Sequence, residues 1–322
     1  MYRYNSFIIT LVFVSMGILH FSGCNLLFNP IEIPEGVPRN AFAKEEMNFM
    51  IIGDWGRKGR GFQQKVADQM AIQAAIDSSR FVLSTGDNFY NDGVKSLNDE
   101  HWDLSFENVY TQNALSVRWY ISLGNHDYKG NVEAQIDYGK QNPRWYLPTK
   151  YYKEEFTLAD STKALFIFLD TTPLNDNILN QDEISQAKTE PAHQLKWLDD
   201  TLAQNQAAWK IVIGHHPLFS VGEKHQDNET MIGNLRSILE RHEVQAYFSG
   251  HAHSLQHIVP SGRINYFISG SGSKVRRVHR NEATVAAESV PGFIAASLTS
   301  QKLFVQFVGL EGQMHHEAVV YR

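Results

Sequence analysis

Residues 80–90 read RFVLSTGDNFY, a short apolar run that ends in a Gly-Asp pair, with Tyr90 three residues after Asp87. The run has the length and the aromatic and β-branched content of a buried strand. A lone Gly-Asp after a strand is most often a turn or a helix cap, although it also presents a carboxylate to a site. The sequence therefore raises the question of why a phenol stands beside this carboxylate.

The same pattern, an apolar run that ends in glycine and a polar cluster, recurs along the chain. It is found in MNFMIIGDWG (47–56), VRWYISLGNHD (117–127), ALFIFLDTT (164–172), WKIVIGHHP (209–217) and VQAYFSGHAH (244–253). Segments with apolar residues at helical spacing lie between these runs, at 62–76, 193–204 and 231–242. Strands that alternate with helices predict an α/β fold with a largely buried sheet and ligands at the carboxyl ends of its strands.

The pattern changes after Ser269. The segments 293–312 and 314–322 have the pattern of consecutive antiparallel strands. We expect these strands to form a second sheet that packs on the first.

Composition and charge narrow the classes of partner. The chain has 322 residues, of which 43% are hydrophobic and 20% are charged, as in ordinary globular proteins. A net charge of −6 argues against a general nucleic-acid binder, so we expect no nucleic-acid partner. The basic run at 273–280 fits a solvated loop, although it could also attract anionic substrates.

The first residues have the pattern of an export signal. Arg3 precedes an apolar run, 7–19, which is shorter than the ~20 residues that span a bilayer. The run leads into Phe-Ser-Gly-Cys at 21–24, which resembles a bacterial lipobox with Phe21 in the place of the usual leucine. Cys24 is the only cysteine, so no disulfide framework explains it.

We therefore expect a lipoprotein signal peptide at 1–23, a lipid-anchored, proline-containing tether at 24–45 and a single domain at 46–322. A lipid on Cys24 would hold an exported, periplasmic or cell-surface protein at a membrane. An ordinary cleaved signal with a stray cysteine is the alternative.

The polar residues at the predicted strand ends form a set of oxygen and nitrogen donors without a thiolate. Such a set suits a hard or borderline metal such as iron, zinc or manganese. It is too large for one tetrahedral ion and suits two ions bridged by a carboxylate, as in two-metal phosphoryl-transfer sites. In GHAH, the two histidines alternate, which predicts that they face different metals from an extended segment. The candidate ligands are Asp54, Asp87, Tyr90, Asn125, His215, His251 and His253.

The order GDWG, GDNFY, GNHD, VIGH, GHAH resembles the purple acid phosphatases, in particular the small tartrate-resistant type, within the calcineurin-like metallophosphoesterases. GDNFYNDGV, FLDTTPL and QLKWLDDTL are also similar to that type in wording and order, and the resemblance extends from Phe49 to the C-terminus. It implies a four-layer α/β/β/α sandwich with two packed mixed sheets. It also implies an acid phosphatase that hydrolyses phosphate monoesters by attack of a metal hydroxide on phosphorus.

The resemblance assigns each ligand to a metal. Fe(III) would be held by Asp54, Asp87, Tyr90 and His253, and a divalent iron, zinc or manganese ion by Asn125, His215, His251 and the bridging Asp87. His126 would bind the phosphate or protonate the leaving oxygen, and His225 matches a second pocket histidine with one extra residue before it. His216, in the place of an aromatic residue, is expected to support the ligands or to form the pocket wall.

Tyr90 helps to distinguish an acid phosphatase from two alternative functions. A related phosphodiesterase or nucleotidase shares the dimetal core but typically lacks this tyrosine, and a non-catalytic surface binding protein would not need every ligand. A free tyrosine has a pKa of ~10, so a phenolate at neutral or acidic pH needs a strongly Lewis-acidic partner such as Fe(III). The segment 180–191 reads as a solvated loop, and a role as a lid over the site is an open alternative.

Overall fold

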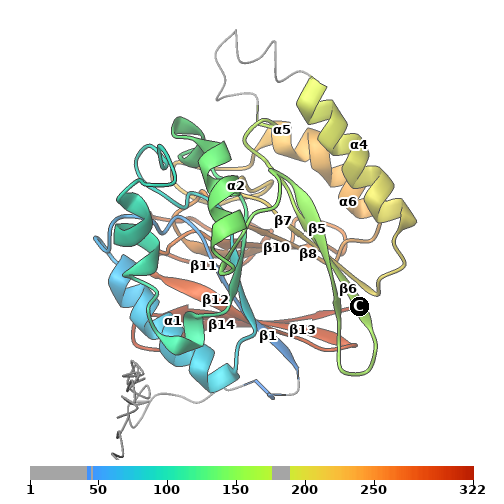
Figure 1. Cartoon of the computed structure of the whole chain (residues 1–322). Coiled ribbons are helices and arrows are strands. Elements are labelled where there is room, and N and C mark those ends of the chain that lie inside the picture. Colours follow the sequence, from blue (N-terminus) through green and yellow to red (C-terminus); the bar gives the residue numbers. More distant parts are fainter. Residues whose placement is uncertain (1–41, 45, 176–188) are drawn as a thin grey trace, which may run out of the picture. The chain divides into compact units, whose positions relative to one another are not determined.

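The computed structural model describes residues 42–44, 46–175 and 189–322, whose strands form two seven-stranded sheets (Figure 1). The predicted signal peptide, the lipid on Cys24 and all but the end of the tether lie outside the described residues, as does most of the loop at 180–191. No described helix has the length and apolar character needed to cross a membrane.

The first sheet is built around β1 (Met47–Ile52), which is buried along its whole length. On one side of β1 lie three parallel strands, β2 (Phe81–Ser84), β3 (Arg118–Ile121) and β4 (Trp145–Tyr146). On its other side lie three antiparallel strands, β12 (Gly292–Leu298), β13 (Lys302–Gly309) and β14 (Met314–Tyr321).

The antiparallel pairing of the C-terminal strands is confirmed, but their expected place in a separate second sheet is wrong. Met47 pairs with Leu298, so β12 continues the first sheet at the free edge of β1. A central strand has two edges that must both be hydrogen-bonded, and β2 occupies only one of them. The C-terminal strands satisfy the other.

The second sheet comes from the middle of the chain. Its order is β11 (Thr284–Glu288), β9 (Leu255–Ile258), β10 (Asn265–Ser269), β8 (Ala246–Ser249), β7 (Trp209–Ile213), β6 (Lys163–Phe168) and β5 (Tyr152–Thr157). The strands β6, β7, β8 and β10 run parallel, so their carboxyl ends lie at one edge. This parallel core contains the predicted strands at 164–172, 209–217 and 244–253.

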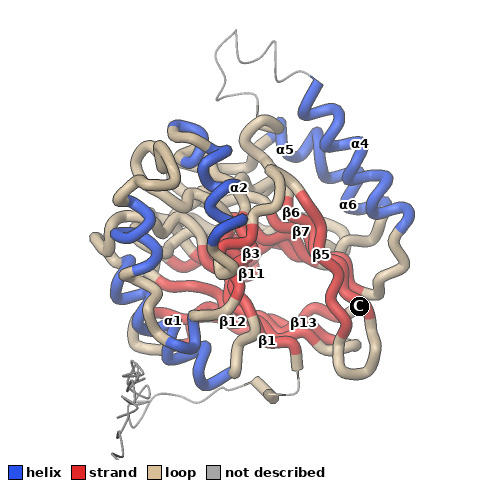
Figure 2. The backbone as a smooth tube through the Cα atoms, viewed as in Figure 1, coloured by secondary structure: helices blue, strands red, loops and turns tan. Residues whose placement is uncertain are grey.

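Helices cover the outer face of each sheet (Figure 2), which confirms the four-layer α/β/β/α sandwich. The first sheet packs against α1 (Gln63–Asp77) and α2 (Val132–Gln141), and the second against α4 (Thr189–Gln204) and α6 (Ser237–Arg241). The helix predicted at 231–242 contains a π-helical turn at Ile232–Arg236, between the short α5 (Glu229–Met231) and α6. Short helical turns also lie at Asp103–Glu107, Asn113–Leu115 and Asp127–Lys129.

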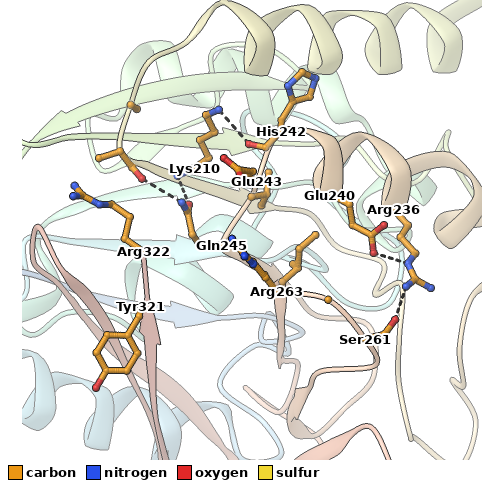
Figure 3. Close-up of a pocket in the computed structure, with 15 residues that line it drawn as sticks. Lys210, Arg236, Glu240, His242, Glu243, Gln245, Ser261, Arg263, Tyr321 and Arg322 are labelled. Carbon is orange, nitrogen blue, oxygen red and sulfur yellow. Dashed lines mark hydrogen bonds and ion pairs between the residues drawn. The ribbon is translucent and has the colours of Figure 1, made fainter.

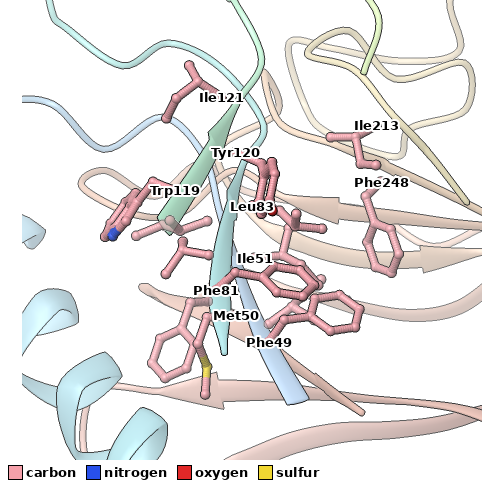
Figure 4. Packing of buried hydrophobic residues seen from close by; sticks show 14 of the residues in the cluster. Phe49, Met50, Ile51, Phe81, Leu83, Trp119, Tyr120, Ile121, Ile213 and Phe248 are labelled. Carbon is pink, nitrogen blue, oxygen red and sulfur yellow. The ribbon is translucent and has the colours of Figure 1, made fainter. Parts of the chain in front are cut away.

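Aromatic side chains join the two sheets (Figure 4). Phe49 of β1 stacks on Phe81 of β2, with ring centroids 5.0 Å apart, and meets Phe166 of β6 edge-on at 5.6 Å. All three rings are almost completely buried, so each contributes about 1.5–3 kcal/mol from removal of apolar surface from water. This contact between β1 and β6 fixes the two sheets relative to each other, with the carboxyl ends of their parallel strands at the same side of the sandwich.

A buried carboxylate at the end of α1 gives a pH-dependent stability. Burial raises the pKa of Asp77 to about 6 from its usual 3.8, although Gln73 and the backbone of Phe42 donate to it. The folded state therefore favours protonated Asp77, and stability falls as pH rises from about 4 to 6. Asp77→Asn removes this titration. The difference in free energy of unfolding between Asp77→Asn and the wild type is therefore expected to increase, in favour of the variant, by at most about 3 kcal/mol from pH 4 to pH 7.

Urea unfolding of metal-free protein at both pH values measures this difference. The control is Asp68→Asn, which changes an exposed carboxylate of the same helix. Curves for Asp77→Asn and wild type that stay parallel across this range would contradict the expectation.

Candidate metal centre

The carboxyl ends of strands from both sheets bring the predicted ligands together. Asp54 follows β1, Asp87 and Tyr90 follow β2, and Asn125 follows β3 in the first sheet. The histidines follow β7 and β8 of the second sheet. The site is therefore formed where the parallel cores of the two sheets face each other.

One group of side chains gathers around the phenol of Tyr90. Its hydroxyl oxygen lies 2.8 Å from Asp54 Oδ1 and 2.7 Å from Asp87 Oδ2, so its single proton is shared between two carboxylates. His253 Nε2 lies 3.2 Å from the same hydroxyl and 3.3 Å from Asp54 Oδ1. Asp54, Asp87, Tyr90 and His253 are all buried, so these four donors form one enclosed cluster.

A second group lies on the other side of Asp87. His215 Nε2 is 3.4 Å from Asp87 Oδ1 and 3.2 Å from Asn125 Oδ1. His251 Nδ1 is 3.1 Å from Asn125 Oδ1 and 3.2 Å from His215 Nε2. Asp87 thus places one carboxylate oxygen against the side chains of each group.

The division of the GHAH histidines between the two groups has a different cause from the one expected. The segment is a turn and not an extended strand, and His251 has a φ of 65°. The backbone N–H of His251 donates to Asp54 Oδ2 at 2.8 Å, which holds the turn against the first sheet. The turn separates the side chains of His251 and His253.

The backbone is strained at the site. Asp54 and Asp87 have φ values of 60° and 53°, in the left-handed region that side chains other than glycine seldom adopt. Each such residue costs on the order of 1–3 kcal/mol and persists where the surroundings impose it. Together with His251, three of the predicted ligands share this strain.

The electrostatics of the cluster call for cations. Asp54 and Asp87 are two buried carboxylates on one phenol, and no described Lys or Arg lies within 4.0 Å of either. Burial raises the pKa of Asp54, but the hydrogen bond and charge of His253, together with His215 and Tyr90, lower the pKa overall. Two adjacent buried negative charges are unfavourable without a counter-charge, so the donor set fits metal cations.

Tyr90 requires a particularly strong cation to ionise. Burial, followed by the charges of Asp54 and Asp87, raises its pKa well above the usual 10. Its hydroxyl therefore stays protonated unless a cation takes the place of the proton between the two carboxylates.

The surroundings of His215 orient its free nitrogen. Its Nδ1 lies 2.8 Å from the carbonyl oxygen of Thr85, so Nδ1 carries the donated proton and Nε2 keeps its lone pair. A backbone carbonyl on the outer nitrogen is the usual support of a metal-bound imidazole. Burial would lower the pKa of His215, but Asp87 and Asp54 raise it overall.

His216 belongs to the wall of the site. A nitrogen of each of His215, His216 and His251 lies within 4.8 Å of the others, which makes them a candidate metal triad. Thr171 Oγ1, however, accepts from the backbone N–H groups of His215 and His216 and so donates its own proton to His216 Nδ1. The neutral ring then carries its proton on Nε2, which leaves no lone pair for a metal.

Asp127 was not among the predicted site residues, although it ends the GNHD motif. It is buried and accepts from the backbone of Asn88 and Gly124 and from the side chain of Gln135. Burial, with the charge of Asp87, raises its pKa to about 7. These contacts tie the loop after β2 to the loop after β3 and so hold Asp87 beside Asn125.

His126 and His225 both lie at the rim of the cluster. The backbone N–H of His126 donates to Asp87 Oδ1 at 2.8 Å, and its ring is 4.4 Å from the ring of Tyr90. The ring of His225 is 4.2 Å from that of His251, and its Nε2 accepts from Arg276 at 2.8 Å. Arg276 comes from the basic run at 273–280, which forms a loop as expected.

The opening beside the second group is a cavity of about 450 Å³, lined in part by Asn125, His225 and His251. A larger cavity, of about 1050 Å³, lies at the opposite ends of the strands, and is lined by Lys210 near the start of β7 and by Tyr321 at the end of β14 (Figure 3). Arg236 and Glu240 pair there at 2.8 Å. None of the predicted ligands lines it, so we assign the chemistry to the smaller opening.

Comparisons with known proteins agree with this geometry. The family model of the calcineurin-like phosphoesterases matches residues 47–255. Purple acid phosphatase 4 of Arabidopsis thaliana is 36% identical over 286 residues, which cover 84% of this chain and 82% of that protein. Human tartrate-resistant acid phosphatase type 5 is 31% identical over 294 residues, or 84% of this chain and 90% of that protein. The chain belongs to the purple acid phosphatase family.

A solved structure of the same fold carries a different description. GAP50, described as the anchor in the inner membrane complex of Plasmodium, is 27% identical, with a TM-score of 0.75 over 86% of this chain and 89% of that one. The purple acid phosphatase sandwich is thus similar to a protein described as an anchor.

Gly86 gives a test of how the site holds its predicted ligands. Gly86 has a φ of 94°, and a Cβ there would lie 2.7 Å from His215 Nδ1 and 2.9 Å from the backbone nitrogen of Gly124. We expect Gly86→Ala to lower the free energy of unfolding by about 2–3 kcal/mol and to weaken metal binding. Chemical unfolding and metal analysis of the purified variant measure both effects.

The control is Gly233→Ala, where an added Cβ meets nothing within 4 Å in a helical turn. It is expected to be neutral or slightly stabilising. Wild-type stability and metal content in Gly86→Ala would show that the loop after β2 tolerates the displacement.

Proposed function

We propose that the protein is an acid phosphatase that hydrolyses phosphate monoesters at an Fe(III)–M(II) centre. The observation that carries the proposal is the Tyr90 hydroxyl, placed 2.8 Å and 2.7 Å from two buried carboxylates. A phenol so strongly protected from ionisation needs a trivalent cation to become a ligand. Family membership, and relatives named acid phosphatases, support the same reaction.

The two groups of donors correspond to the two metals of the proposal. Fe(III) would be held by Asp54, Asp87, Tyr90 and His253, and divalent iron, zinc or manganese by Asn125, His215, His251 and the shared Asp87. When bound, the cations would supply the Lewis acidity that polarises the phosphate and activates water.

His126 is placed to act on the leaving group. Its Nδ1 lies against the carbonyl oxygen of Asn91, which fixes the proton of that nitrogen. The transferable proton is therefore the one on Nε2, which lies 4.0 Å from Asp87 Oδ2. The side chain is 24% exposed, so an ester oxygen can approach it from solvent. Protonated His126 would give this proton to the departing alcohol.

His225 is better placed to bind phosphate than to transfer a proton. Burial, with the neighbouring Arg276, lowers its pKa to about 4, so it is neutral at mildly acidic pH. Because Nε2 accepts from Arg276, the ring proton is on Nδ1. His225 would thus offer an N–H donor to a phosphate oxygen in the 450 Å³ opening.

The likeness to GAP50 favours one second candidate, a non-catalytic anchoring or binding protein. Assays with an aryl phosphate monoester and the matching diester, beside metal analysis, separate the possibilities. The proposal predicts about one iron and one further metal per chain, with the monoester hydrolysed faster at acidic pH. Faster diester hydrolysis would favour a phosphodiesterase, and no hydrolysis by a fully metal-loaded protein would favour the binding protein.

A further inference from the structure

Arg57, three residues after Asp54, lies over the face of the Tyr90 ring. Its guanidinium carbon is 3.5 Å from the ring centroid, a short separation for a cation over an aromatic face. Tyr90 as a whole is only 6% exposed. Arg57 therefore covers one face of the phenol on which the proposed iron site depends.

The position of Arg57 is fixed by several hydrogen bonds. Its Nε donates to Ser273 Oγ at 2.9 Å, and the hydroxyl of Ser273 in turn donates to the carbonyl oxygen of Asp54. The backbone N–H of Arg57 donates to Gln63 Oε1 at 2.8 Å. The guanidinium is thus held to the same loop that presents Asp54.

The charge of Arg57 is not neutralised by an acid. Among the described residues, ion pairs form at Arg144, Arg236, Arg241 and Arg280, but Arg57 forms none. Its bond to Ser273 is made to a neutral oxygen. A cation without a neutralising partner, over a buried ring, acts directly on the electrons of that ring.

We infer that Arg57 is a positioning residue that orients Tyr90 and sets the electronic energy of its phenolate. The inference rests on the proposed function, since it concerns Tyr90 as a ligand of Fe(III). Charge transfer from the phenolate moves an electron away from the ring beneath the guanidinium. The positive charge opposes that loss, so Arg57 raises the energy of the visible transition.

The test compares iron-loaded variants by visible absorption, with iron content measured on the same samples. In Arg57→Gln, the charge-transfer band shifts to longer wavelength. In Arg57→Lys, which keeps the charge but loses the planar fork, the band stays near the wild-type position. The control is Arg60→Gln, which removes an exposed charge from the same cavity of about 690 Å³ and leaves the band unchanged.

Each outcome has a distinct meaning. An iron-loaded Arg57→Gln with the wild-type band overturns the inference and leaves the proposed function intact. A shift in Arg57→Lys as large as that in Arg57→Gln overturns the electrostatic role. An iron-loaded wild type without a visible band overturns the proposed iron–tyrosinate centre and this inference with it. Because Arg57 and Tyr90 line an open cavity, removal of the guanidinium leaves no enclosed void.

Discussion

Asp87→Asn is expected to lose the metal pair and to lower kcat/KM for a phosphate monoester by at least about a thousandfold, since bound cations contribute several kcal/mol to such reactions. The carboxylate of Asp87 contacts side chains of both donor groups, Tyr90 in one and His215 in the other. An amide supplies one neutral oxygen in place of two anionic ones, so one cation loses its ligand and both lose the bridging negative charge. Metal analysis and steady-state kinetics on one preparation measure the two losses together.

The stability of the metal-free protein separates this loss from misfolding. Asp87 lies beside Asp54, and no described lysine or arginine pairs with either within 4.0 Å, so removal of one charge relieves repulsion. Metal-free Asp87→Asn is therefore expected to be at least as stable as the metal-free wild type. The control is Asp92→Asn, an exposed carboxylate on the same loop. Wild-type metal content and turnover in Asp87→Asn would refute the bridging role.

His126→Ala is expected to lower kcat for an alkyl phosphate by about 10²-fold or more and for an aryl phosphate with a good leaving group far less. An alkoxide is a poor leaving group and depends on a proton donor, whereas a stabilised aryl oxide departs without one. The backbone N–H that donates to Asp87 is kept in this variant, so the metal ligands are not disturbed.

The leaving-group series gives the decisive comparison for His126. The slope of log kcat against leaving-group pKa is expected to be steeper in His126→Ala than in the wild type. His193→Ala, on the exposed surface of α4, controls for loss of a histidine. A His126→Ala enzyme that keeps wild-type turnover on poor leaving groups would rule out the acid role.

The site was more predictable than the arrangement of the sheets. Asp54, Asp87 and Asn125 each lie in the short loop just after a strand, so their placement at the strand ends depends on local pattern. The pairing partner of β12 cannot be predicted from local pattern, because the sequence of an antiparallel strand is compatible with an edge of either sheet. Only the free edge of β1 decides it.

Other features of the site depend on contacts between distant segments. The turn at His251 is held by Asp54, which is 197 residues earlier in the chain, and GHAH by itself is compatible with a strand. Thr171, from the loop after β6, decides the tautomer of His216. The buried acceptor role of Asp127 had a signal in the sequence, an aspartate after two candidate site residues, but its partners come from other segments.

The visible spectrum of the purified, iron-loaded protein, compared with that of Tyr90→Phe, tests the central claim most directly. Phenylalanine keeps the ring beneath Arg57 but removes the oxygen that lies between Asp54 and Asp87. The wild type is predicted to show a charge-transfer band in proportion to its iron content, and Tyr90→Phe is predicted to lack it. An iron-loaded wild type without the band, or an unchanged band in Tyr90→Phe, would contradict the assignment of Tyr90 as the ligand of Fe(III).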